Sequence, residues 1–366
     1  MGASGSDGGS HAVDAVGVAV VGLGYWGPKL LRVLHELPGA HPVAACDTDA
    51  EACAVHAQRY PDLEVVGDLD TLLADDRVEA VIVATPIGSH VEIARRALLA
   101  GKHVLVEKPM APSVEECVEL IDLAGERGLT LMPGHTYLYS PAVQAIADLL
   151  SAGDLGDVLY VTSSRVNLGG HRPDYNVICD LAPHDLSIMH YWFGWPTFIR
   201  AIGRSSVLPG VEDVAFIDVG FPSGLLVHIT LSWLAPAKER RTVLVGEHKM
   251  VVYEDTLAEP VSVFDRRAEL DGDPALNGKA PTVQYQWGEV VRPSLADDEP
   301  LNLELADFLN SVRTGCKPRV TAHAGLQIVQ LIQAAERSMS EGGGPVFLDE
   351  PSQGNVAEPV AADGKR

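Results

Sequence analysis

The sequence has few of the features that mark exported, membrane-spanning or zinc-binding proteins. Its 366 residues contain no apolar run as long as a membrane span. The first residues are rich in Gly, Ser and Asp instead of forming a basic segment followed by an apolar one. Only five cysteines are present, scattered and without a Cys-x-x-Cys pair, so we expect reduced thiols and no zinc site. Together these absences predict a soluble, cytoplasmic protein.

Basic residues are also scarce. The 27 Lys and Arg are outnumbered by 50 Asp and Glu, which gives a net charge of -23. Nucleic acids and anionic membranes would be repelled, so neither is expected as a partner. An anionic small substrate is not excluded, because a few local Arg and Lys side chains decide that. Hydrophobic residues make up 46% of the chain, enough for the cores of two domains of ordinary size.

A glycine-rich loop stands near the start of the chain. The apolar run Val16–Val21 leads directly into Gly22-Leu23-Gly24-Tyr25-Trp26-Gly27, and a helix-like segment follows over residues 28–37. Strand, loop and helix in this order are the context in which Gly-x-Gly-x-x-Gly binds the pyrophosphate of a dinucleotide. The alternative interpretation is an ordinary glycine turn between a strand and a helix.

A second apolar strand, over residues 43–46, ends in Asp47, twenty residues after Gly27. Dinucleotide-binding folds place at this position the acid that accepts hydrogen bonds from the adenosine ribose. A carboxylate there would repel a 2′-phosphate, and no Arg is present among residues 48–51. The pattern therefore favours NAD over NADP as the cofactor.

A short apolar strand over residues 103–106 ends in Glu107-Lys108-Pro109. Adjacent charges are costly to bury, and the carboxyl ends of parallel strands are where open α/β sheets bind ligands. Pro109 ends the strand and permits a cis bond after Lys108. We predict that Lys108 is catalytic and that Glu107 contacts the cofactor.

Three further cofactor contacts are predicted at the same edge of the sheet. Thr85-Pro86 closes an apolar strand over residues 78–84, and His90 opens the next helix. A loop that caps a helix explains Thr85 and Ser89 equally well.

The pattern of elements predicts two domains. Strands and helices alternate with short loops over residues 14–134, which indicates a doubly wound parallel sheet. Over residues 135–345, one helix is followed by strands without intervening helices, which indicates an α+β domain with an antiparallel or mixed sheet. Residues 254–300 have no clear pattern. Residues 1–13 are predicted to be disordered, and residues 346–366 are predicted to form a flexible acidic tail. The strands of the second domain are expected at 158–166, 198–207, 215–219, 225–231, 242–245 and 250–253, and later helices at 303–313 and 325–340.

Asp180-Leu181-Ala182-Pro183-His184-Asp185 precedes a helix-like stretch over residues 187–193. Asp180 and His184 are four residues apart, so on a helix or tight turn they face one pocket. Oxidation of a secondary alcohol needs a base for the hydroxyl proton, and the usual pKa of His suits that role near neutrality. Asp180 would orient this base, and Lys108 would stabilise the developing alkoxide.

Three other interpretations of this cluster stay open. Asp185 is interpreted more readily as a helix cap than as a catalytic group, and Asp180 is also a candidate cap. The Asp and His side chains, with His190, are candidate metal ligands, although no recognised ligand motif is present. Taken alone, His184 would be interpreted as a structural histidine.

In combination, the Gly22–Gly27 loop, Glu107-Lys108-Pro109 and Asp180-x-x-x-His184 resemble the glucose–fructose oxidoreductase / inositol dehydrogenase / rhizopine-catabolism (Gfo/Idh/MocA) family over residues 15–340. The resemblance implies a Rossmann domain followed by an open-faced, mostly antiparallel mixed sheet, with dimers or tetramers built through that sheet. It implies that Lys108, Asp180 and His184 form the catalytic set, with the lysine positioning substrate and cofactor and the histidine acting as general acid/base. It also implies that loop amides at Tyr25 and Trp26 hold the pyrophosphate.

Residues 177–185, 135–141 and 165–169 are similar to family members that oxidise the C3 hydroxyl of UDP-N-acetylglucosamine or its uronic acid. This similarity places Tyr139, Arg165 and Asn167 near the substrate. Pro183 stands where many members have Gly or a small residue, which is expected to change the backbone before His184. We therefore predict an NAD-dependent dehydrogenase of a sugar or nucleotide sugar. The alternatives are a free-polyol dehydrogenase of the inositol type and a non-catalytic dinucleotide-binding regulator.

Overall fold

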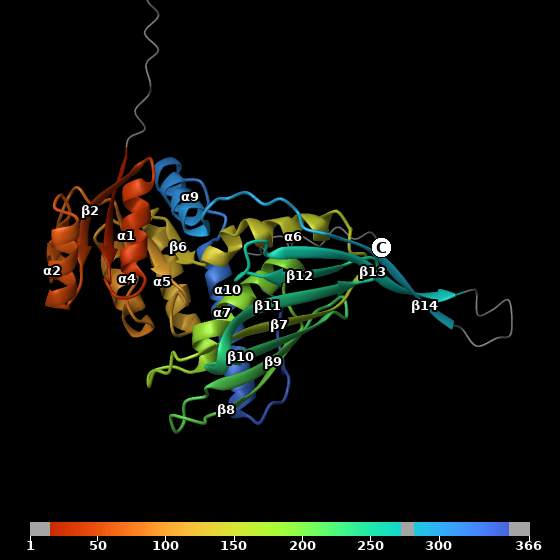
Figure 1. Ribbon diagram of the computed structural model, residues 1–366. Coiled ribbons are helices and arrows are strands. Elements are labelled where there is room, and N and C mark those ends of the chain that lie inside the picture. The colour runs from red at the N-terminus through yellow and green to blue at the C-terminus, as the bar shows by residue number, and fades with distance from the viewer. Residues whose placement is uncertain (1–14, 272–281, 351–366) are drawn as a thin grey trace, which may run out of the picture. The chain divides into compact units, whose positions relative to one another are not determined.

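The computed structural model describes residues 15–271 and 282–350 (Figure 1). The segment predicted to be disordered and most of the predicted tail lie outside these ranges. The chain divides into two compact units, and neither is a single stretch of sequence. Unit 1 contains residues 15–107, 122–132 and 305–319, and unit 2 contains the other described residues.

Unit 1 is built on a six-stranded sheet with the order β3-β2-β1-β4-β5-β6, in which the strands from β3 to β5 pair in parallel. Every residue of β1 and β4 is buried, as expected for central parallel strands covered on both faces by helices. This arrangement confirms the predicted doubly wound domain. The strands are β1 (Val16–Val21), β2 (Ala40–Cys46), β3 (Glu64–Val66), β4 (Ala80–Val83), β5 (His103–Glu107) and β6 (Leu131–Gly134). The helices are α1 (Gly27–Glu36), α2 (Ala50–Arg59), α3 (Leu69–Leu73), α4 (His90–Leu99), the second part of α5 (Val114–Arg127) and most of α9 (Pro300–Thr314), with the 3₁₀ turn η1 (Ile87–Ser89).

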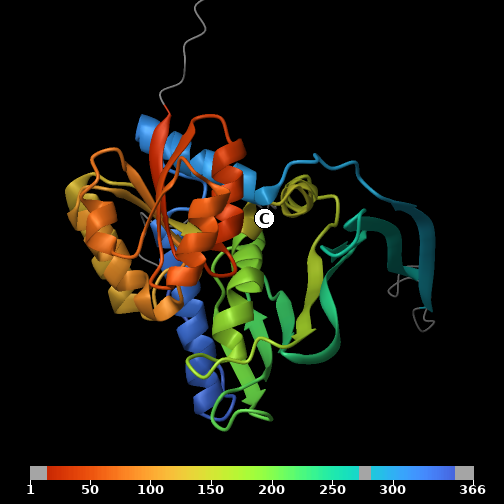
Figure 2. The same cartoon turned by 60° about the vertical axis from the view of Figure 1, so that its left-hand side comes forward.

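Unit 2 contains a mixed sheet whose described strands have the order β14-β13-β12-β11-β7-β10-β9-β8-β15. Its pairs are antiparallel except for β7 with β10, which confirms the predicted, mostly antiparallel sheet. Helices lie along one face of this sheet (Figures 1 and 2). The strands are β7 (Val158–Leu168), β8 (Phe198–Arg204), β9 (Val214–Gly220), β10 (Leu226–Ser232), β11 (Leu234–Gly246), β12 (Met250–Glu254), β13 (Val261–Asp271), β14 (Thr282–Val291) and β15 (Val346–Phe347). The helices are α6 (Pro141–Ser151), α7 (Val177–Phe193) and α10 (Ala322–Ser340), with the 3₁₀ turn η2 (Thr136–Tyr139).

The structure corrects the sequence prediction in three places. Helix α7 begins at Val177, ten residues before the helix predicted over 187–193, because Asn176 caps it by accepting hydrogen bonds from two backbone amides. The segment without a clear pattern contains β13 and β14. Val346 and Phe347, predicted to belong to a flexible tail, pair with β8 instead.

The described residues, 15–271 and 282–350, contain no membrane-spanning helix, disulfide or metal-binding cluster. No helix there has both the length and the apolar character that crossing a bilayer requires. All five cysteines are unpaired thiols. No group of three or more His, Cys, Asp or Glu side chains in these ranges is arranged to hold a metal ion.

Candidate active site

The three glycines of the loop after β1 have different surroundings. Gly22 has a φ of +99°, and a Cβ added there would lie 2.7 Å from the carbonyl carbon and oxygen of Ala84. A Cβ on Gly27 would lie 2.0 Å from the carbonyl oxygen of Gly22, so the first turn of α1 packs tightly on the loop. A Cβ on Gly24 would meet no atom within 4 Å. Only Gly24 is open to an approaching ligand, which is the role of the second glycine in a pyrophosphate-binding loop.

Asp47 connects the end of β2 to this loop. Its Oδ2 accepts a hydrogen bond from the backbone N–H of Leu23 at 2.5 Å, and its Oδ1 accepts one from the N–H of Asp49 at 2.9 Å. The carboxyl ends of β1 and β2 thus bring the predicted ribose acid and the predicted phosphate loop together. These residues fit a dinucleotide, because they combine an open backbone with a fixed carboxylate.

The aromatic residues of the loop differ in exposure. Tyr25 is 82% exposed, and the Nζ of Lys29 lies 3.7 Å from the centre of its ring. Trp26 is half-buried, and its indole Nε1 is a buried donor for which the described residues supply no acceptor. An N–H in that position is available to an oxygen of a bound cofactor.

Thr85, Pro86 and His90 form one small hydrogen-bonded loop after β4. Ser89 Oγ donates to Thr85 Oγ1 at 2.8 Å and to the carbonyl oxygen of Pro86 at 2.9 Å. His90 Nε2 donates to the carbonyl oxygen of Thr85 at 2.8 Å. The loop holds its own shape at the carboxyl end of β4, and half-buried Glu107 ends the neighbouring strand β5. Their contacts with a cofactor stay predictions.

Gly22→Ala is expected to lower the stability of the protein, whereas Gly24→Ala is expected to lower its affinity for NAD. Ala at Gly22 is strained by its positive φ and by the Ala84 carbonyl, so we expect a loss of stability of roughly 1–3 kcal/mol, seen as a lower Tm. Ala at Gly24 fits without contact, so its Tm is expected to stay within about 2 °C of the native value. NAD affinity is expected to fall at least about 10-fold in Gly24→Ala, because the methyl group occupies the approach to the loop. Thermal unfolding and NADH fluorescence titration measure the two effects, and unaltered NAD affinity in Gly24→Ala would contradict the assignment of the loop.

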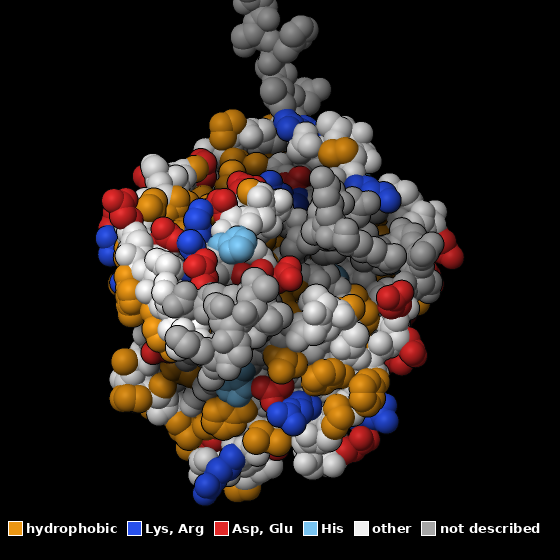
Figure 3. All heavy atoms as spheres, turned by 90° about the vertical axis from the view of Figure 1, so that its right-hand side faces the viewer, with side chains coloured by type: hydrophobic (Ala, Val, Ile, Leu, Met, Phe, Trp, Pro, Cys, Tyr) orange, Lys and Arg blue, Asp and Glu red, His pale blue; other side chains and the backbone are white. Residues whose placement is uncertain are grey.

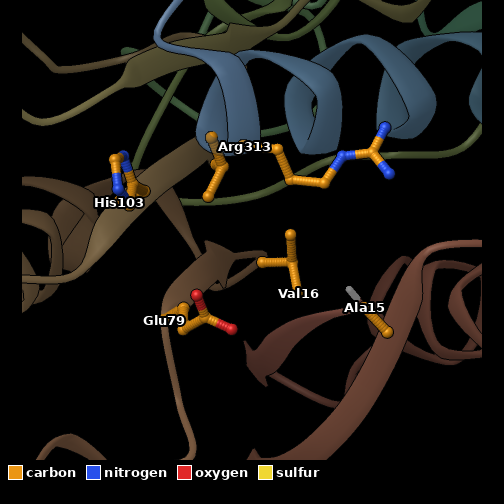
Figure 4. A pocket seen from close by; sticks show the side chains of 6 residues that line it. Ala15, Val16, Glu79, His103 and Arg313 are labelled. Carbon is orange, nitrogen blue, oxygen red and sulfur yellow. The ribbon is translucent and has the colours of Figure 1, made fainter. Parts of the chain in front are cut away.

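The cavity shown in Figure 4 lies at the other edge of the same sheet. Val16 and His103 begin β1 and β5, so this is the amino-terminal edge, away from Gly24 and Asp47. Glu79 there accepts a hydrogen bond from the N–H of Gly17 at 2.9 Å. The cavity, of about 320 Å³, is therefore distinct from the predicted cofactor site; it is lined by Ala15, Val16, Glu79, His103, Val312 and Arg313.

In unit 2, Lys108 and Asp180 are in contact. Lys108 Nζ donates to the main-chain oxygen of Asp180 at 2.8 Å and lies 3.7 Å from its carboxylate Oδ1. The other carboxylate oxygen, Oδ2, accepts a hydrogen bond from Nε1 of the buried Trp233 at 3.1 Å. The carboxylate is thus held between an ammonium group and an indole, and the Lys108–Pro109 bond is cis.

Asp180 and His184 lie one turn apart on α7, with Pro183 inside the helix. Proline has no N–H, so the carbonyl oxygen of Cys179 has no helical donor from that position. The predicted change in the backbone before His184 is therefore a proline within a continuous helix, not a separate turn. The spacing of four residues brings both side chains to one face of α7.

His184 is half-buried, and its Nδ1 is a buried atom without a hydrogen-bond partner among the described residues. Burial lowers the pKa of His184 well below its usual value of 6.5, and the positive charges of Lys108, Arg165 and Arg240 lower it further. The neighbouring His135 is buried, and burial, with Lys108, lowers its pKa to about 3. His184 is therefore a neutral imidazole at pH 7, the form that accepts a proton.

Asp185 is not a helix cap, and that prediction was wrong. It is 2% exposed within α7, where its Oδ2 accepts a hydrogen bond from Arg165 Nε at 2.5 Å. Ser163 Oγ donates to its Oδ1 at 2.7 Å. Arg165 is 5% exposed, so a nearly dry ion pair joins β7 to α7 beside His184.

Tyr137 was not among the site residues predicted from the sequence. Its ring centre lies 4.8 Å from that of His184, and the guanidinium of Arg165 lies 4.7 Å from the same ring. Tyr139, which was predicted to contact the substrate, is 1% exposed. Asn167, another predicted contact, donates to the carbonyl oxygen of Gly169 at 3.1 Å. The contacts of Tyr139, Arg165 and Asn167 with a substrate stay predictions.

Two family models match the chain. The first, described as an oxidoreductase family with an NAD-binding Rossmann fold, covers residues 16–135. The second, described as the GFO/IDH/MocA C-terminal domain, covers residues 143–252. The matches fall on the glycine loop and Lys108 in the first case, and on Asp180 and His184 in the second.

Individual proteins similar to this chain are named for different substrates and reactions. A UDP-N-acetylglucosamine 3-dehydrogenase of Acidithiobacillus ferrooxidans is 27% identical over 86% of this chain and 96% of its own. A scyllo-inositol 2-dehydrogenase (NADP⁺) of Bacillus subtilis is 26% identical over 91% of this chain and 96% of its own. A 2,7-anhydro-N-acetylneuraminate hydratase of Mediterraneibacter gnavus is 39% identical, but the match spans only 42% of this chain and 40% of the hydratase. Among solved structures, GenD2 from gentamicin A biosynthesis, in complex with NAD, has a TM-score of 0.77 and 26% identity over 95% of this chain and 100% of its own.

Proposed function

We propose that this chain, which belongs to the Gfo/Idh/MocA family of oxidoreductases, oxidises a secondary hydroxyl of a nucleotide sugar, at C3, with NAD as the hydride acceptor. The observation that carries the proposal is the convergence of Lys108, Asp180 and His184 in unit 2. Lys108 Nζ is 2.8 Å from the main-chain oxygen of Asp180, and His184 follows one turn later on α7. A protein that only binds a dinucleotide needs no such set.

In this mechanism, each member of the set has a separate task. The neutral imidazole of His184 takes the hydroxyl proton at Nε2, since Nδ1 is the buried nitrogen. The Lys108 ammonium stabilises the negative charge that develops on the substrate oxygen. Asp180 fixes that ammonium through its main-chain oxygen and its carboxylate. NAD, when bound, would supply the acceptor for the hydride that leaves the carbon bearing this hydroxyl.

We propose that Asp47 makes the enzyme prefer NAD to NADP. Its carboxylate is held by the N–H groups of Leu23 and Asp49 at the end of β2, where it would accept the ribose hydroxyls and repel a 2′-phosphate. Asp47→Ala is expected to reduce the ratio of kcat/KM for NAD to that for NADP at least about 10-fold, because a charged discriminating contact is removed. Steady-state kinetics with both cofactors measure the ratio. Asp49→Ala, which alters the adjacent cap of α2, is the matched control, and an unaltered ratio in Asp47→Ala would contradict the assignment.

The nucleotide-sugar substrate is supported by the match along nearly the full length of the UDP-N-acetylglucosamine 3-dehydrogenase. The second candidate, an inositol, is supported by an equally long match to a scyllo-inositol dehydrogenase. A panel of uridine-diphosphate sugars, free hexoses and inositols, each with NAD, decides between them through nicotinamide absorbance and product mass. Loss of two hydrogens from a nucleotide sugar supports the first proposal. Turnover of inositols alone supports the second, and an inactive panel with NADH still binding contradicts both.

We also propose that the enzyme self-associates through the open face of the unit 2 sheet. Tyr160, Phe216 and Leu226 are 47%, 40% and 56% exposed on that face, while Val161 and Val227 beside them are buried. An exposed apolar patch of this kind marks an interaction site. Figure 3 shows further hydrophobic side chains in the lower part of the face that it presents.

Leu226→Asp combined with Phe216→Asp is expected to shift the enzyme from dimer or tetramer to monomer, because the introduced charges would be buried in the interface. Analytical ultracentrifugation measures the mass. Val55→Asp, at a 55% exposed apolar residue of α2 in unit 1, is the control and is expected to leave the mass unchanged. A monomeric native protein would overturn this part of the proposal.

A further inference from the structure

We propose that Tyr137 is a positioning residue for His184: its ring sets the orientation of the imidazole and keeps water from it. This inference rests on the proposed function, in which His184 is the base. Tyr137 lies in the segment 135–141 that resembles nucleotide-sugar enzymes, but only the side-chain arrangement in unit 2 gives it a role.

The rings of Tyr137 and His184 are in contact. Their centres are 4.8 Å apart and their planes are inclined by 63°, an edge-to-face arrangement that is favourable between aromatic rings. A catalytic histidine is ordinarily oriented by a hydrogen bond from its second nitrogen to a carboxylate or carbonyl oxygen. His184 Nδ1 is buried and has no such partner in the described parts of the chain. Packing against Tyr137 therefore takes the place of that hydrogen bond.

Two hydrogen bonds hold the hydroxyl group of Tyr137 in place. Its hydroxyl donates to Asp255 Oδ2 at 2.9 Å and accepts a hydrogen bond from Arg240 Nη1 at 2.5 Å. Arg240 Nη1 also lies 3.2 Å from the same Asp255 oxygen. The hydroxyl end is thus fixed by an ion pair that joins β11 to the residue after β12.

The ring of Tyr137 is held by a second ion pair. The guanidinium of Arg165 lies 4.7 Å from its centre, within the range of a cation–π contact. Arg165 is in turn fixed by Asp185, the residue after His184 on α7. One tyrosine therefore ties the histidine to two ion pairs, and a shift of the ring would shift His184 relative to its substrate.

Burial and nearby positive charges both act on the imidazole of His184. The groups that act on the imidazole are Lys108 after β5, Arg165 on β7, Arg240 on β11 and His135 before η2, and all of them disfavour a positive charge on it. Burial has a larger effect on its pKa than any of these groups. Because Tyr137 packs directly on the ring, removing that side chain admits water and is expected to raise the pKa of His184 toward 6.5.

The test compares Tyr137→Phe with Tyr137→Leu in the full-length enzyme. Phe keeps the ring and loses only the hydroxyl, whereas Leu removes the ring. The pKa of His184 is measured by NMR of the imidazole Cε1–H in histidine-labelled protein, with His184→Asn to identify the signal. Stopped-flow and steady-state assays give kcat, and NADH titration gives the cofactor affinity.

We expect Tyr137→Leu to lower kcat by about 10- to 100-fold, the size of effect that a misplaced catalytic group produces, and to raise the pKa of His184. Tyr137→Phe is expected to retain most of kcat and the low pKa, and both variants are expected to bind NADH as the native enzyme does. Tyr139→Leu, at the buried tyrosine two residues away, is the control for general loss of packing and is expected to leave the pKa of His184 unchanged.

An unchanged His184 pKa and kcat in Tyr137→Leu would overturn the proposal. An equal rise of the pKa in Tyr139→Leu would also overturn it, since the effect would then be general loosening. The pKa measurement needs no turnover, so it separates this inference from the proposed function. If His184→Asn keeps full activity, the proposed function fails, whatever Tyr137 does to the imidazole.

Discussion

Lys108→Ala is expected to lower kcat by about 10²- to 10³-fold, the loss seen when one charged or hydrogen-bonding stabiliser of a developing oxyanion is removed. The ammonium is held by two oxygens of Asp180, 2.8 Å and 3.7 Å from Nζ, so its position is fixed before substrate binds. Lys108→Arg is expected to lose nearly as much, because a planar guanidinium does not place its charge where Nζ lies. Steady-state kinetics with the best substrate of the panel measure both variants.

Two controls accompany this prediction. NADH titration is expected to show that cofactor binding largely survives, which separates loss of chemistry from loss of cofactor. Lys249→Ala removes a lysine whose Nζ lies 3.5 Å from Asp154 in unit 2, outside the catalytic set, and is expected to leave kcat unchanged. Turnover in Lys108→Ala within a few-fold of the native rate would remove the lysine from the mechanism.

His184→Asn is expected to lower kcat by about 10²- to 10⁴-fold, the range of a positioned general base. Asn is similar in size and does not accept the hydroxyl proton. His228→Asn, at a 45% exposed histidine on the open sheet face, is the matched control and is expected to leave kcat unchanged. Native turnover in His184→Asn would show that another group is the base.

The pH dependence of the native enzyme follows from the same residue. The neutral imidazole is the active form for oxidation, and burial holds the pKa of free His184 well below 6.5. Oxidation is therefore expected to keep a constant kcat/KM from pH 8 down through 6.5 and to fall only as the pH drops through that lowered pKa. The reverse reduction needs the protonated imidazole, so its kcat/KM is expected to fall as the pH rises above the same value. An acid limb at or above pH 6.5 in the oxidation profile would contradict a buried, neutral base.

The sequence was sufficient to predict those parts of the fold and the site that are formed by residues close together in the chain. The glycine loop lies between a strand and a helix within a dozen residues, and the strand that leads to Lys108 is a short apolar run. Asp180 and His184 are one helical turn apart, so spacing alone brought them to one face. For these elements the local pattern and the tertiary structure agree.

The sequence was insufficient to predict the contacts between side chains that are far apart in the chain. Tyr137 is 103 residues from Arg240 and 118 from Asp255, and no periodic pattern links such positions. Asp185 was interpreted as a cap because it stands just before the helix predicted over residues 187–193, whereas α7 begins at Val177 and continues through Pro183. A charged residue that is buried against one arginine, 20 positions away, has no local signature.

The division of the chain into units has a consequence for how the protein is made. Leu305, Phe308 and Leu309 of α9 are buried and belong to unit 1, although the rest of that unit ends at residue 132. A ribosome therefore synthesises unit 2 as far as residue 304 before it supplies the part of α9 that completes the dinucleotide-binding unit. During that interval the apolar surface under α9 is without its cover and is open to aggregation or chaperone binding. Unit 1 emerges first, but it cannot finish folding until residues 305–319 have been synthesised.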